Sequence, residues 1–331
     1  MIIHLNKSVS LQQAEALAEK HQSILLNNGQ LTLITSGKLK TVDDELKAVA
    51  EEIFVTDSDI QLASKQYIKT KREVNLGGVT IGGATNNCIA ITGPCSVESE
   101  EQIESAAKLC VELGVKVLRA GAFKPRTSPY TFQGLGLEGL KLLAKMRDKY
   151  GLQIITEVRD STHADDVIEY ADIIQIGAKS MYDHGILRKC GTSKKPVLLK
   201  RGFGTTLQEF VQAAEFILSG GNPNVILCER GIRTFETKTR FTLDLCGVSW
   251  LKEYTNLPVI LDPSHAIGYA YGVPDLSRAC VAMGIDGLLI ESHPNPKVAK
   301  SDADQQLNFD EFRTLHGSLK KVADAVGYTI V

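Results

Sequence analysis

The sequence predicts an α/β protein in which a (β/α)8 TIM barrel follows a small βαββαβ, ferredoxin-like domain. Eight short apolar runs recur between residues 88 and 293, and amphipathic segments with helical periodicity separate them. Continuous apolar runs are typical of parallel strands that are buried on both faces of a sheet. Nearly every run ends in charged or metal-binding residue types, and barrels of this kind carry their chemistry at the carboxyl ends of the strands.

The predicted barrel occupies about 240 residues, close to the roughly 250 residues that are typical of this fold. Helices are expected at Glu100–Leu113, Leu137–Tyr150 and Leu207–Ser219. Strands are expected within Cys88–Cys95, Val115–Arg126, Leu152–Val158, Ile173–Lys179, Pro196–Gly202, Val225–Arg233, Pro258–His265 and Gly287–His293.

Residues 1–67 do not follow this rhythm and are expected to form the ferredoxin-like domain. Ile2–Leu5 is the first predicted strand, and a capping box of Ser10 and Gln13 begins a helix that continues to about Lys20. The turn sequence Asn28-Gly29 is expected to join two strands, Ser23–Leu26 and Leu31–Thr35, into a hairpin.

The second half of this domain is expected to repeat the helix and strand. A helix begins near Thr41 with Asp44, and its apolar stripe continues to Ile53. A last strand at Phe54–Thr56 completes the order β-α-β-β-α-β.

The segment between the two domains is first basic and then rich in glycine. Residues 58–73 are expected to be a solvated connector, with a binding patch as the alternative. The glycine-rich segment Val74–Gly83 is expected to be a hairpin that plugs the amino-terminal end of the barrel. The predicted domains are therefore residues 1–67 and residues 68–331.

The composition is that of an ordinary globular protein. Of the 331 residues, 43% are hydrophobic and 23% are charged, and no apolar stretch approaches the roughly 20 residues that span a bilayer. The first residues lack the features of a signal peptide. Seven cysteines without a C-x-x-C pair argue against a disulfide framework, so we expect a reducing, cytoplasmic location. The net charge of −2 gives no general attraction to nucleic acids or membranes.

Cations are concentrated at the predicted carboxyl ends of the strands. If they converge on one mouth, the site suits small substrates that carry several negative charges. These residues are Arg119, Lys124, Arg126, Lys179, Lys200, Arg201, Arg230 and Arg233.

Four possible metal ligands follow the first and the last two strands. Cys95 ends the first strand, His265 the seventh and Glu291 the eighth, and Asp302 follows in the next loop. The first and last strands of a closed barrel are neighbours, so these side chains are expected to meet. Thiolate, imidazole and carboxylate together suit a divalent transition metal. Taken alone, Cys95 is more simply a small core residue.

Three further groups point to anion binding. Arg119, Lys124 and Arg126 surround a loop stiffened by Pro125, with a solvated charged loop as the alternative. Lys200-Arg201-Gly202 and Glu229-Arg230-Gly231 place cations beside glycines whose N–H groups are expected to approach a phosphate. A salt-bridge network is the competing interpretation. Glu157 and Asp262 are expected to hold a water, to accept a proton or to balance charge.

Long motifs in consistent order resemble the type Iβ branch of the 3-deoxy-D-arabino-heptulosonate 7-phosphate (DAHP) synthase family, over about residues 74–328. The family catalyses the first step of the shikimate pathway, which leads to chorismate and the aromatic amino acids. The resemblance implies an aldol-like condensation of phosphoenolpyruvate (PEP) with erythrose 4-phosphate, aided by a divalent metal such as Mn, Fe, Co or Zn. The motifs are GPCSVES, RAGAFKPRTSPYTFQGLG, QIGAKS, PVLLKRGF, ILCERGIRTFE, LDPSHA, LIESHP and SDADQQL.

Matched by motif position, the resemblance implies a complete site. Its metal ligands fall on Cys95, His265, Glu291 and Asp302. The PEP carboxylate is assigned to Arg119, Lys124 and Lys200, and the PEP phosphate to Arg230 and Lys179. Erythrose 4-phosphate is assigned to Lys124, Arg126, Thr127 and Ser128. The catalytic roles are assigned to Lys124 as proton donor, Glu157 at the attacking water and Asp262 near the metal and the sugar.

One position departs from the family pattern, because Lys179 stands where the family usually has arginine. A lysine loses bidentate contact with a phosphate, so PEP affinity is expected to be lower. The resemblance also implies feedback inhibition by tyrosine or phenylalanine through the amino-terminal domain, and a homotetramer. An assembly role for this domain is the alternative.

Three alternatives to this activity stay open. The related synthase of 3-deoxy-octulosonate 8-phosphate also condenses PEP with a phosphosugar, but it lacks the KPRTS loop. A Schiff-base aldolase would use Lys200. A non-catalytic metabolite sensor would keep the barrel without the reaction.

Overall fold

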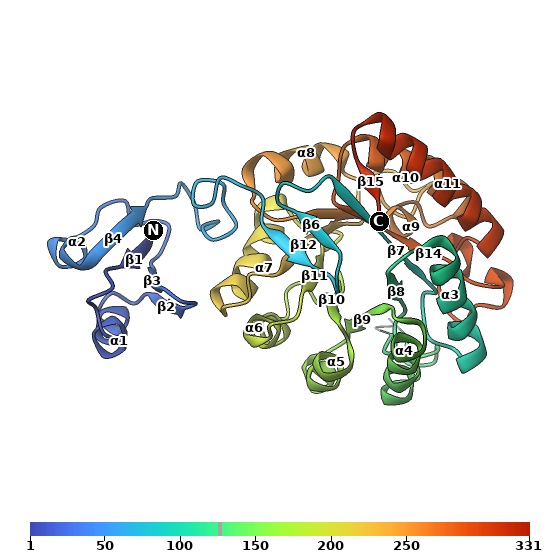
Figure 1. The fold of residues 1–331 in the computed structure, drawn as a ribbon, viewed down its shortest axis with the longest axis horizontal. Helices are drawn as coiled ribbons and strands as arrows, with labels where there is room; N and C mark the ends of the chain where they lie inside the picture. The colour runs from blue at the N-terminus through green and yellow to red at the C-terminus, as the bar shows by residue number, and fades with distance from the viewer. Residues whose placement is uncertain (125–127) are drawn as a thin grey trace.

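The computed structural model describes residues 1–124 and 128–331, which form a small amino-terminal module beside a larger barrel (Figure 1). In the module, the order of elements is β-α-β-β-α-β, and the four strands form an antiparallel sheet in the order β2-β3-β1-β4. These elements are β1 (Ile2–Leu5), α1 (Leu11–Lys20), β2 (Ile24–Asn27), β3 (Leu31–Ile34), α2 (Asp44–Val49) and β4 (Ala50–Phe54).

The helices α1 and α2 supply one side of the module's core. Ile3, Leu5 and Leu33 from the sheet pack with Ala14 of α1 and Leu46 of α2. The expected capping box of Ser10 and Gln13 is present at the start of α1. The element order and the antiparallel sheet agree with the predicted βαββαβ arrangement.

The second helix is shorter than the sequence predicts. Its cap is Asp43, whose side chain accepts a hydrogen bond from the Leu46 N–H, and the helix ends at Val49. Residues 50–54 form β4 and pair with β1, so the prediction of a helical stripe through Ile53 was wrong. Pairing with the free edge of β1 satisfies backbone groups there, and this tertiary contact overrides a local helical pattern.

The expected solvated connector is in fact packed on the barrel over part of its length. Residues 60–64 are buried, and Glu215 of α7 (Leu207–Ser219) accepts hydrogen bonds from the backbone N–H groups of Gln61, Leu62 and Ala63. The donor–acceptor distances are 2.8, 3.1 and 2.8 Å. The connector is therefore attached to the barrel by specific hydrogen bonds, which its basic composition does not indicate.

A hairpin closes the amino-terminal end of the barrel, as predicted. Strands β5 (Glu73–Asn75) and β6 (Thr80–Gly82) pair in antiparallel fashion. Val74, Leu76 and Ile81 are buried, and they pack among inward-facing residues of the barrel strands such as Ile89 and Ile226. This end of the barrel is thus an apolar plug.

Eight parallel strands form the closed barrel, because β14 pairs with β7. The predicted α/β barrel is confirmed. A short β15 (Thr329–Ile330) also pairs with β7. The barrel strands are β7 (Asn87–Gly93), β8 (Val117–Arg119), β9 (Gln153–Val158), β10 (Ile173–Ile176), β11 (Val197–Lys200), β12 (Val225–Glu229), β13 (Val259–Leu261) and β14 (Gly287–Glu291).

Helices surround the strands, and a second apolar core lies between the two layers (Figure 1). Within the described residues, no helix combines the length and the apolar character needed to cross a membrane. The remaining helices are α3 (Glu100–Leu113), α4 (Leu137–Tyr150), α5 (Ala164–Tyr170), α6 (His184–Thr192), α8 (Leu245–Tyr254), α9 (Pro263–Ile267), α10 (Val273–Ala282) and α11 (Phe309–Ala325).

Barrel closure decides which side chains meet at the carboxyl-terminal end. In the β14–β7 register, Glu291 lies opposite Gly93. Cys95 follows Gly93 by two residues, so the chain brings the first and last strand ends together. The site is built around this junction.

Candidate active site

A cavity of about 410 Å³ lies at the carboxyl-terminal mouth of the barrel. Most of the predicted site residues line it, although they come from separate parts of the chain. These cavity-lining residues are Lys124, Ser128, Glu157, Lys179, Lys200, Arg230, His265 and Asp302. The predicted residues Cys95, Asp262 and Glu291 are buried and contact members of this set, and the buried Arg119 contacts Glu291.

The four predicted metal ligands lie together. Ligand atoms of Cys95, Glu291 and Asp302 all lie within 4.8 Å of one another. The Cys95 Sγ is 3.4 Å from the Asp302 Oδ2, and the His265 Nε2 is 3.6 Å from the Glu291 Oε1. A thiol, an imidazole and two carboxylates at these separations form a donor set that suits a divalent transition metal. The residues present therefore fit the metal that the sequence predicts.

The local backbone structure positions two of these predicted ligands, His265 and Asp302. His265 lies in the first turn of α9, where Asp262 caps the helix and accepts a hydrogen bond from the His265 N–H. Asp302 has a φ of +46°, a left-handed conformation that is uncommon for a residue other than glycine. Such backbone strain is concentrated at functional sites in proteins, because the surrounding structure must hold it in place.

Cations and amides contact the same ligands. The Lys124 Nζ is 3.0 Å from the Cys95 Sγ, and the Arg119 guanidinium forms a close ion pair with Glu291. The Gln305 Nε2 donates to the Glu291 Oε2 over 2.6 Å. Burial raises the pKa of Glu291, but the charges of His265 and Arg119 outweigh this effect and the net pKa lies below its ordinary value. Glu291 is therefore an ionised carboxylate at neutral pH.

Asp262 contacts both a predicted metal ligand, His265, and a predicted anion-binding cation, Lys200. Its Oδ2 lies 2.6 Å from the Lys200 Nζ and 2.7 Å from the His265 Nδ1. Although burial raises the pKa of Asp262, His265 and Lys200 lower it well below its ordinary range. The ionised carboxylate thus orients a cavity cation and an imidazole at once, an outer-contact role that is common around metal ligands.

Arg230 has the features of an anion-binding residue. It is 4% exposed, and within the described residues its Nη1 has no hydrogen-bond partner. The guanidinium stacks on the Phe241 ring at 4.2 Å and donates through Nη2 to the His265 carbonyl oxygen. A buried cation with an unused donor that lines the cavity is suited to bind a phosphate or a carboxylate.

Glu157 lines the cavity from β9. The Gln175 Nε2 donates to its Oε2 over 2.8 Å. A Cβ at position 177 would lie 2.0 Å from the Glu157 Oε1, so a side chain there would displace this carboxylate from its present position. The small residue in the Gly177-Ala178-Lys179 segment therefore leaves room for this carboxylate.

Two expectations for the glycine-flanked cations need correction. Arg201 does not line the mouth, because it pairs with Glu229 at 2.9 Å and Asp244 at 2.8 Å. The Gly231 N–H donates to the Glu229 Oε1 over 2.7 Å, so it does not approach a phosphate. Each motif thus places one cation in the cavity, Lys200 in the first and Arg230 in the second. The remaining charged residues of the two motifs, Arg201 and Glu229, pair with each other in a structural ion-pair network.

Residues 59–327 match the sequence model of the DAHP synthetase I family. This chain belongs to the DAHP synthetase I family.

Within this family, the chain is 48% identical to a phospho-2-dehydro-3-deoxyheptonate aldolase from Thermotoga maritima over 270 residues, covering 82% of this chain and 79% of the relative. A crystal structure of that DAHP synthase from Thermotoga maritima aligns with 100% of this chain and 99% of its own, with 40% identity and a TM-score of 0.81. A 2-dehydro-3-deoxyphosphooctonate aldolase from Bordetella petrii is 32% identical over 69% of this chain and 88% of the relative. The resemblance to the DAHP synthase family is confirmed.

Several cavity residues of this family member were not singled out from its sequence. Arg240 lines the cavity, lies 3.6 Å from Asp302 and donates to Gln305. Phe203 and Phe241 form an aromatic wall. Arg240 and Phe241 lie in the long segment after β12, where no periodicity marks a side chain as facing the mouth. The SDADQQL motif contains Gln305 and was the available signal for that residue.

Part of the predicted substrate loop lies outside the described residues. This applies to Arg126 and Thr127, for which the sequence assignment stays a prediction. Ser128 and Lys124, on either side of them, line the cavity. Arg233 stacks on the Phe203 ring at 4.5 Å.

Proposed function

We propose that this chain uses the mouth cavity to condense PEP with erythrose 4-phosphate, giving DAHP and inorganic phosphate. The observation that carries this proposal is the position of four metal-binding side chains beside a cavity with buried, partly unpaired cations. The reaction brings two phosphorylated molecules together. Preorganised cations offset their mutual repulsion without reorganising during the reaction.

Substrate binding is assigned by charge and position. We assign the PEP carboxylate to Arg119, Lys124 and Lys200, and its phosphate to Arg230 and Lys179. We assign erythrose 4-phosphate to Lys124, Arg126, Thr127 and Ser128. The unused Nη1 donor of Arg230 supports the phosphate assignment.

In the proposed reaction, C3 of PEP attacks the aldehyde carbon of erythrose 4-phosphate, and a carbon–carbon bond forms. Lys124 donates a proton to the aldehyde oxygen as negative charge develops there. Burial lowers the pKa of Lys124, but Cys95 and Glu157 outweigh this effect, so the amine is protonated at neutral pH. A water positioned by Glu157 then adds to C2 of the former PEP and gives one proton to the Glu157 carboxylate. Inorganic phosphate leaves as the bond between C2 and the phosphate oxygen breaks, and it takes the proton of the new C2 hydroxyl, which leaves a ketone at C2.

We propose that Cys95, His265, Glu291 and Asp302 hold a divalent transition metal, with Mn, Fe, Co and Zn as candidates. Such an ion acts as a Lewis acid toward a carbonyl oxygen. Asp262 orients His265 and Lys200 beside this site. Removal of one ligand is expected to reduce metal content as well as turnover, which separates this role from a purely structural one.

A coupled assay tests the proposal. PEP consumption and phosphate release are measured with and without erythrose 4-phosphate, before and after treatment with EDTA and reconstitution with each candidate metal. We expect turnover only when the sugar and a metal are both present. Full activity of a chelator-treated Cys95→Ala variant would refute the metal assignment.

A second candidate is the condensation of PEP with a five-carbon aldose phosphate to give an eight-carbon product. The similarity to the octulosonate aldolases, at 32% identity, favours testing it. The same assay with a five-carbon aldose phosphate distinguishes the two. A higher kcat/KM for the five-carbon sugar would overturn the choice of erythrose 4-phosphate.

We further propose that residues 1–67 form a regulatory domain for residues 68–331, which form the catalytic barrel. Tyrosine or phenylalanine is the proposed feedback inhibitor, and a homotetramer is the proposed assembly. Deletion of residues 1–67 is expected to leave turnover and abolish inhibition, measured as activity against inhibitor concentration. Inhibition that survives the deletion would contradict the regulatory role. The described cysteines are all free, which fits the cytoplasmic location proposed from their pattern.

A further inference from the structure

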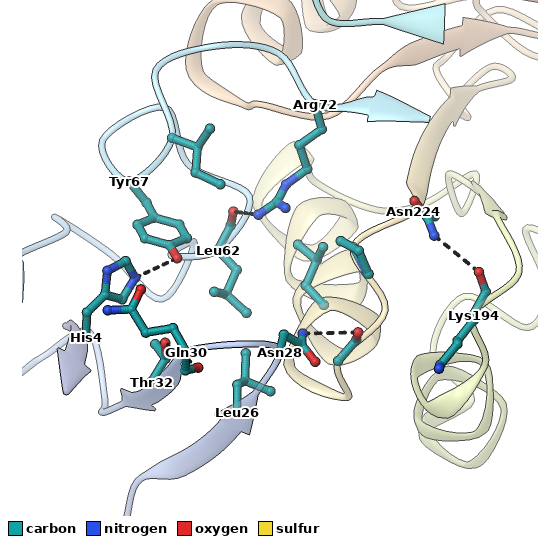
Figure 2. Close-up of a pocket in the computed structure, with 14 residues that line it drawn as sticks. His4, Leu26, Asn28, Gln30, Thr32, Leu62, Tyr67, Arg72, Lys194 and Asn224 are labelled. Atoms are coloured by element: carbon teal, nitrogen blue, oxygen red, sulfur yellow. Dashed lines mark hydrogen bonds between the residues drawn. The ribbon is translucent and has the colours of Figure 1, made fainter. Parts of the chain in front are cut away.

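A cavity of about 560 Å³ lies between the amino-terminal module and the barrel, away from the active-site mouth (Figure 2). The module sheet contributes residues such as His4 and Gln30, and the connector contributes Tyr67 and Arg72. The barrel contributes residues on the amino-terminal side of β11 and β12, including Asn224. Three separate parts of the chain therefore line one cavity.

Arg72 provides a positive charge in this cavity. Its Nε donates to the Asn256 Oδ1 and its Nη2 to the Leu62 carbonyl oxygen, each over 2.9 Å. Both acceptors are neutral, and within the described residues no carboxylate forms an ion pair with Arg72. Burial lowers the pKa of Arg72, and the nearby Tyr67 and Glu215 offset this effect only in part. A bound anion would pair with the Arg72 guanidinium and offset the cost of burying its charge.

The rest of the lining has the same electrostatic character. Among the described residues that line the cavity there is no aspartate or glutamate, although the whole chain has slightly more acidic than basic residues. Lys194 adds a second cation. The His4 Nδ1 lies 3.7 Å from a carboxylate oxygen of Glu52, which is outside the lining. The cavity thus favours an anion, and it offers no carboxylate to a cationic group.

Apolar walls accompany these charges. Leu26, Leu62 and Leu218 line the cavity from the module, the connector and the barrel. The Tyr67 ring packs on Phe54 at a centroid distance of 5.0 Å, and its hydroxyl lies 2.9 Å from the His4 Nε2 (Figure 2). A fixed aromatic ring among leucines suits the apolar body of a ligand, as in pockets with few polar groups that set its orientation.

We propose that this cavity binds a small carboxylate that has an aromatic or apolar body and no cationic group. The carboxylate contacts Arg72, and the Asn28 amide, which also donates to the Gly221 carbonyl oxygen, is a further donor within the lining. The body packs between Leu26, Leu62 and Leu218. A free amino acid is disfavoured, because its ammonium group would lose water without gaining a counter-ion.

Such a ligand would connect the module with the active site. Asn224 immediately precedes β12, and the other end of this strand leads to Arg230 in the mouth. Lys194 precedes β11 in the same way, and β11 ends at Lys200. A ligand held by module and barrel together restricts their relative movement, so we infer that it changes PEP affinity. This second step rests on the proposed function, whereas binding itself does not.

Isothermal titration calorimetry of the full chain tests binding with 3-phenylpropanoate as the probe. Its neutral analogue 3-phenylpropanamide and L-phenylalanine are matched for the aromatic body. We expect 3-phenylpropanoate to bind, and the amide and the amino acid to compete with it at least about tenfold less effectively, as loss of a charged hydrogen bond implies. Absence of binding, or equal binding of the amide, overturns the proposal.

Variants locate the site. Arg72→Gln is expected to weaken 3-phenylpropanoate at least about tenfold, whereas Arg188→Gln, which removes an exposed arginine from α6, leaves affinity unchanged. Leu26→Trp fills the cavity while keeping Arg72 and its contacts, and it is also expected to abolish binding. Unchanged affinity in a folded Leu26→Trp variant overturns the location, even if Arg72→Gln fails to fold.

The KM for PEP, measured with increasing 3-phenylpropanoate, tests the coupling. A change in the unmodified chain that is absent in Leu26→Trp supports it. An unchanged KM overturns the coupling step while the calorimetric result stands. Absence of turnover with any sugar counts against the proposed function, and the binding data stay independent of that outcome.

Discussion

The two ends of the barrel differ in the side chains that close them. At the amino-terminal end, Val74, Leu76 and Ile81 of the hairpin fill the interior with apolar groups. At the carboxyl-terminal end, buried charges such as Glu291 and Asp262 are held in pairs with cations. Buried charges contribute little net stability, because their desolvation offsets their attraction, whereas apolar burial is the main favourable term in folding. One end therefore stabilises the barrel and the other carries its chemistry.

The largest effect is expected at the carboxyl-terminal end, from Lys124→Met. Loss of the proposed proton donor should lower kcat by about 10²- to 10⁴-fold, as for other general acids. Steady-state kinetics measure kcat, and elemental analysis of the bound metal is the control. We expect metal content to persist, because Lys124 contacts Cys95 without being a ligand. A fall in kcat of less than tenfold would contradict the assignment of Lys124 as the proton donor.

The opposite outcome is expected at the amino-terminal end, from Ile81→Ala. This residue is fully buried in the plug, so its truncation should cost about 2–5 kcal/mol of unfolding free energy. Urea denaturation measures the loss. Val79→Ala, at a partly buried position of the same hairpin, should cost less. The kcat of the folded Ile81→Ala enzyme should stay unchanged, and a large fall in kcat would show that the two ends are not separable.

The contact of the connector with α7 is expected to depend on pH through Glu215. Burial raises the pKa of this carboxyl to about 7 from 4.5, although three backbone N–H groups lower it in part. The folded chain then holds a proton that the unfolded chain loses, so the contribution of Glu215 to stability falls as pH rises from about 5 to above 7. The loss of stability is at most roughly 3–4 kcal/mol, since a pKa difference of one unit corresponds to about 1.4 kcal/mol.

Glu215→Gln provides the comparison, because its side chain does not titrate. We expect urea denaturation at pH 5 and pH 8 to show a loss of stability in the unmodified chain that the variant lacks. A loss of equal size in both proteins would assign the pH dependence to other groups. The barrel would then be joined to the module by contacts that are independent of protonation.

The difference between the apolar interior and the charged mouth of the barrel also explains which features could be predicted from the sequence. The strands of the barrel were predictable, because complete burial on both faces leaves a continuous apolar run such as residues 225–228. Closure of β14 on β7 then brings Cys95 next to Glu291 without further information. The plug was predictable for the same reason, since its glycines and apolar residues indicate a buried hairpin.

Other parts depend on contacts that have no local pattern. The packing of Gln61 on Glu215 joins residues 154 positions apart, and nothing near residue 61 indicates it. Arg240 reaches the mouth from a long segment without regular structure. Arg201 and Arg230 have similar neighbours in sequence, but only Arg230 lines the cavity, because Glu229 and Asp244 pair with Arg201. Pairing of this kind is decided by tertiary structure.

The smallest expected effect concerns the residue that departs from the family pattern. Lys179 lines the mouth cavity, and a guanidinium at this position can contact a phosphate through two donors. Lys179→Arg should therefore lower the KM for PEP by about two- to tenfold, since charge-assisted bidentate contacts are the stronger ones. Lys141→Arg, on the exposed face of α4, is the matched control and should leave KM unchanged. A higher KM in Lys179→Arg would mean that the mouth of this enzyme has adapted to the shorter, single-point contact of lysine.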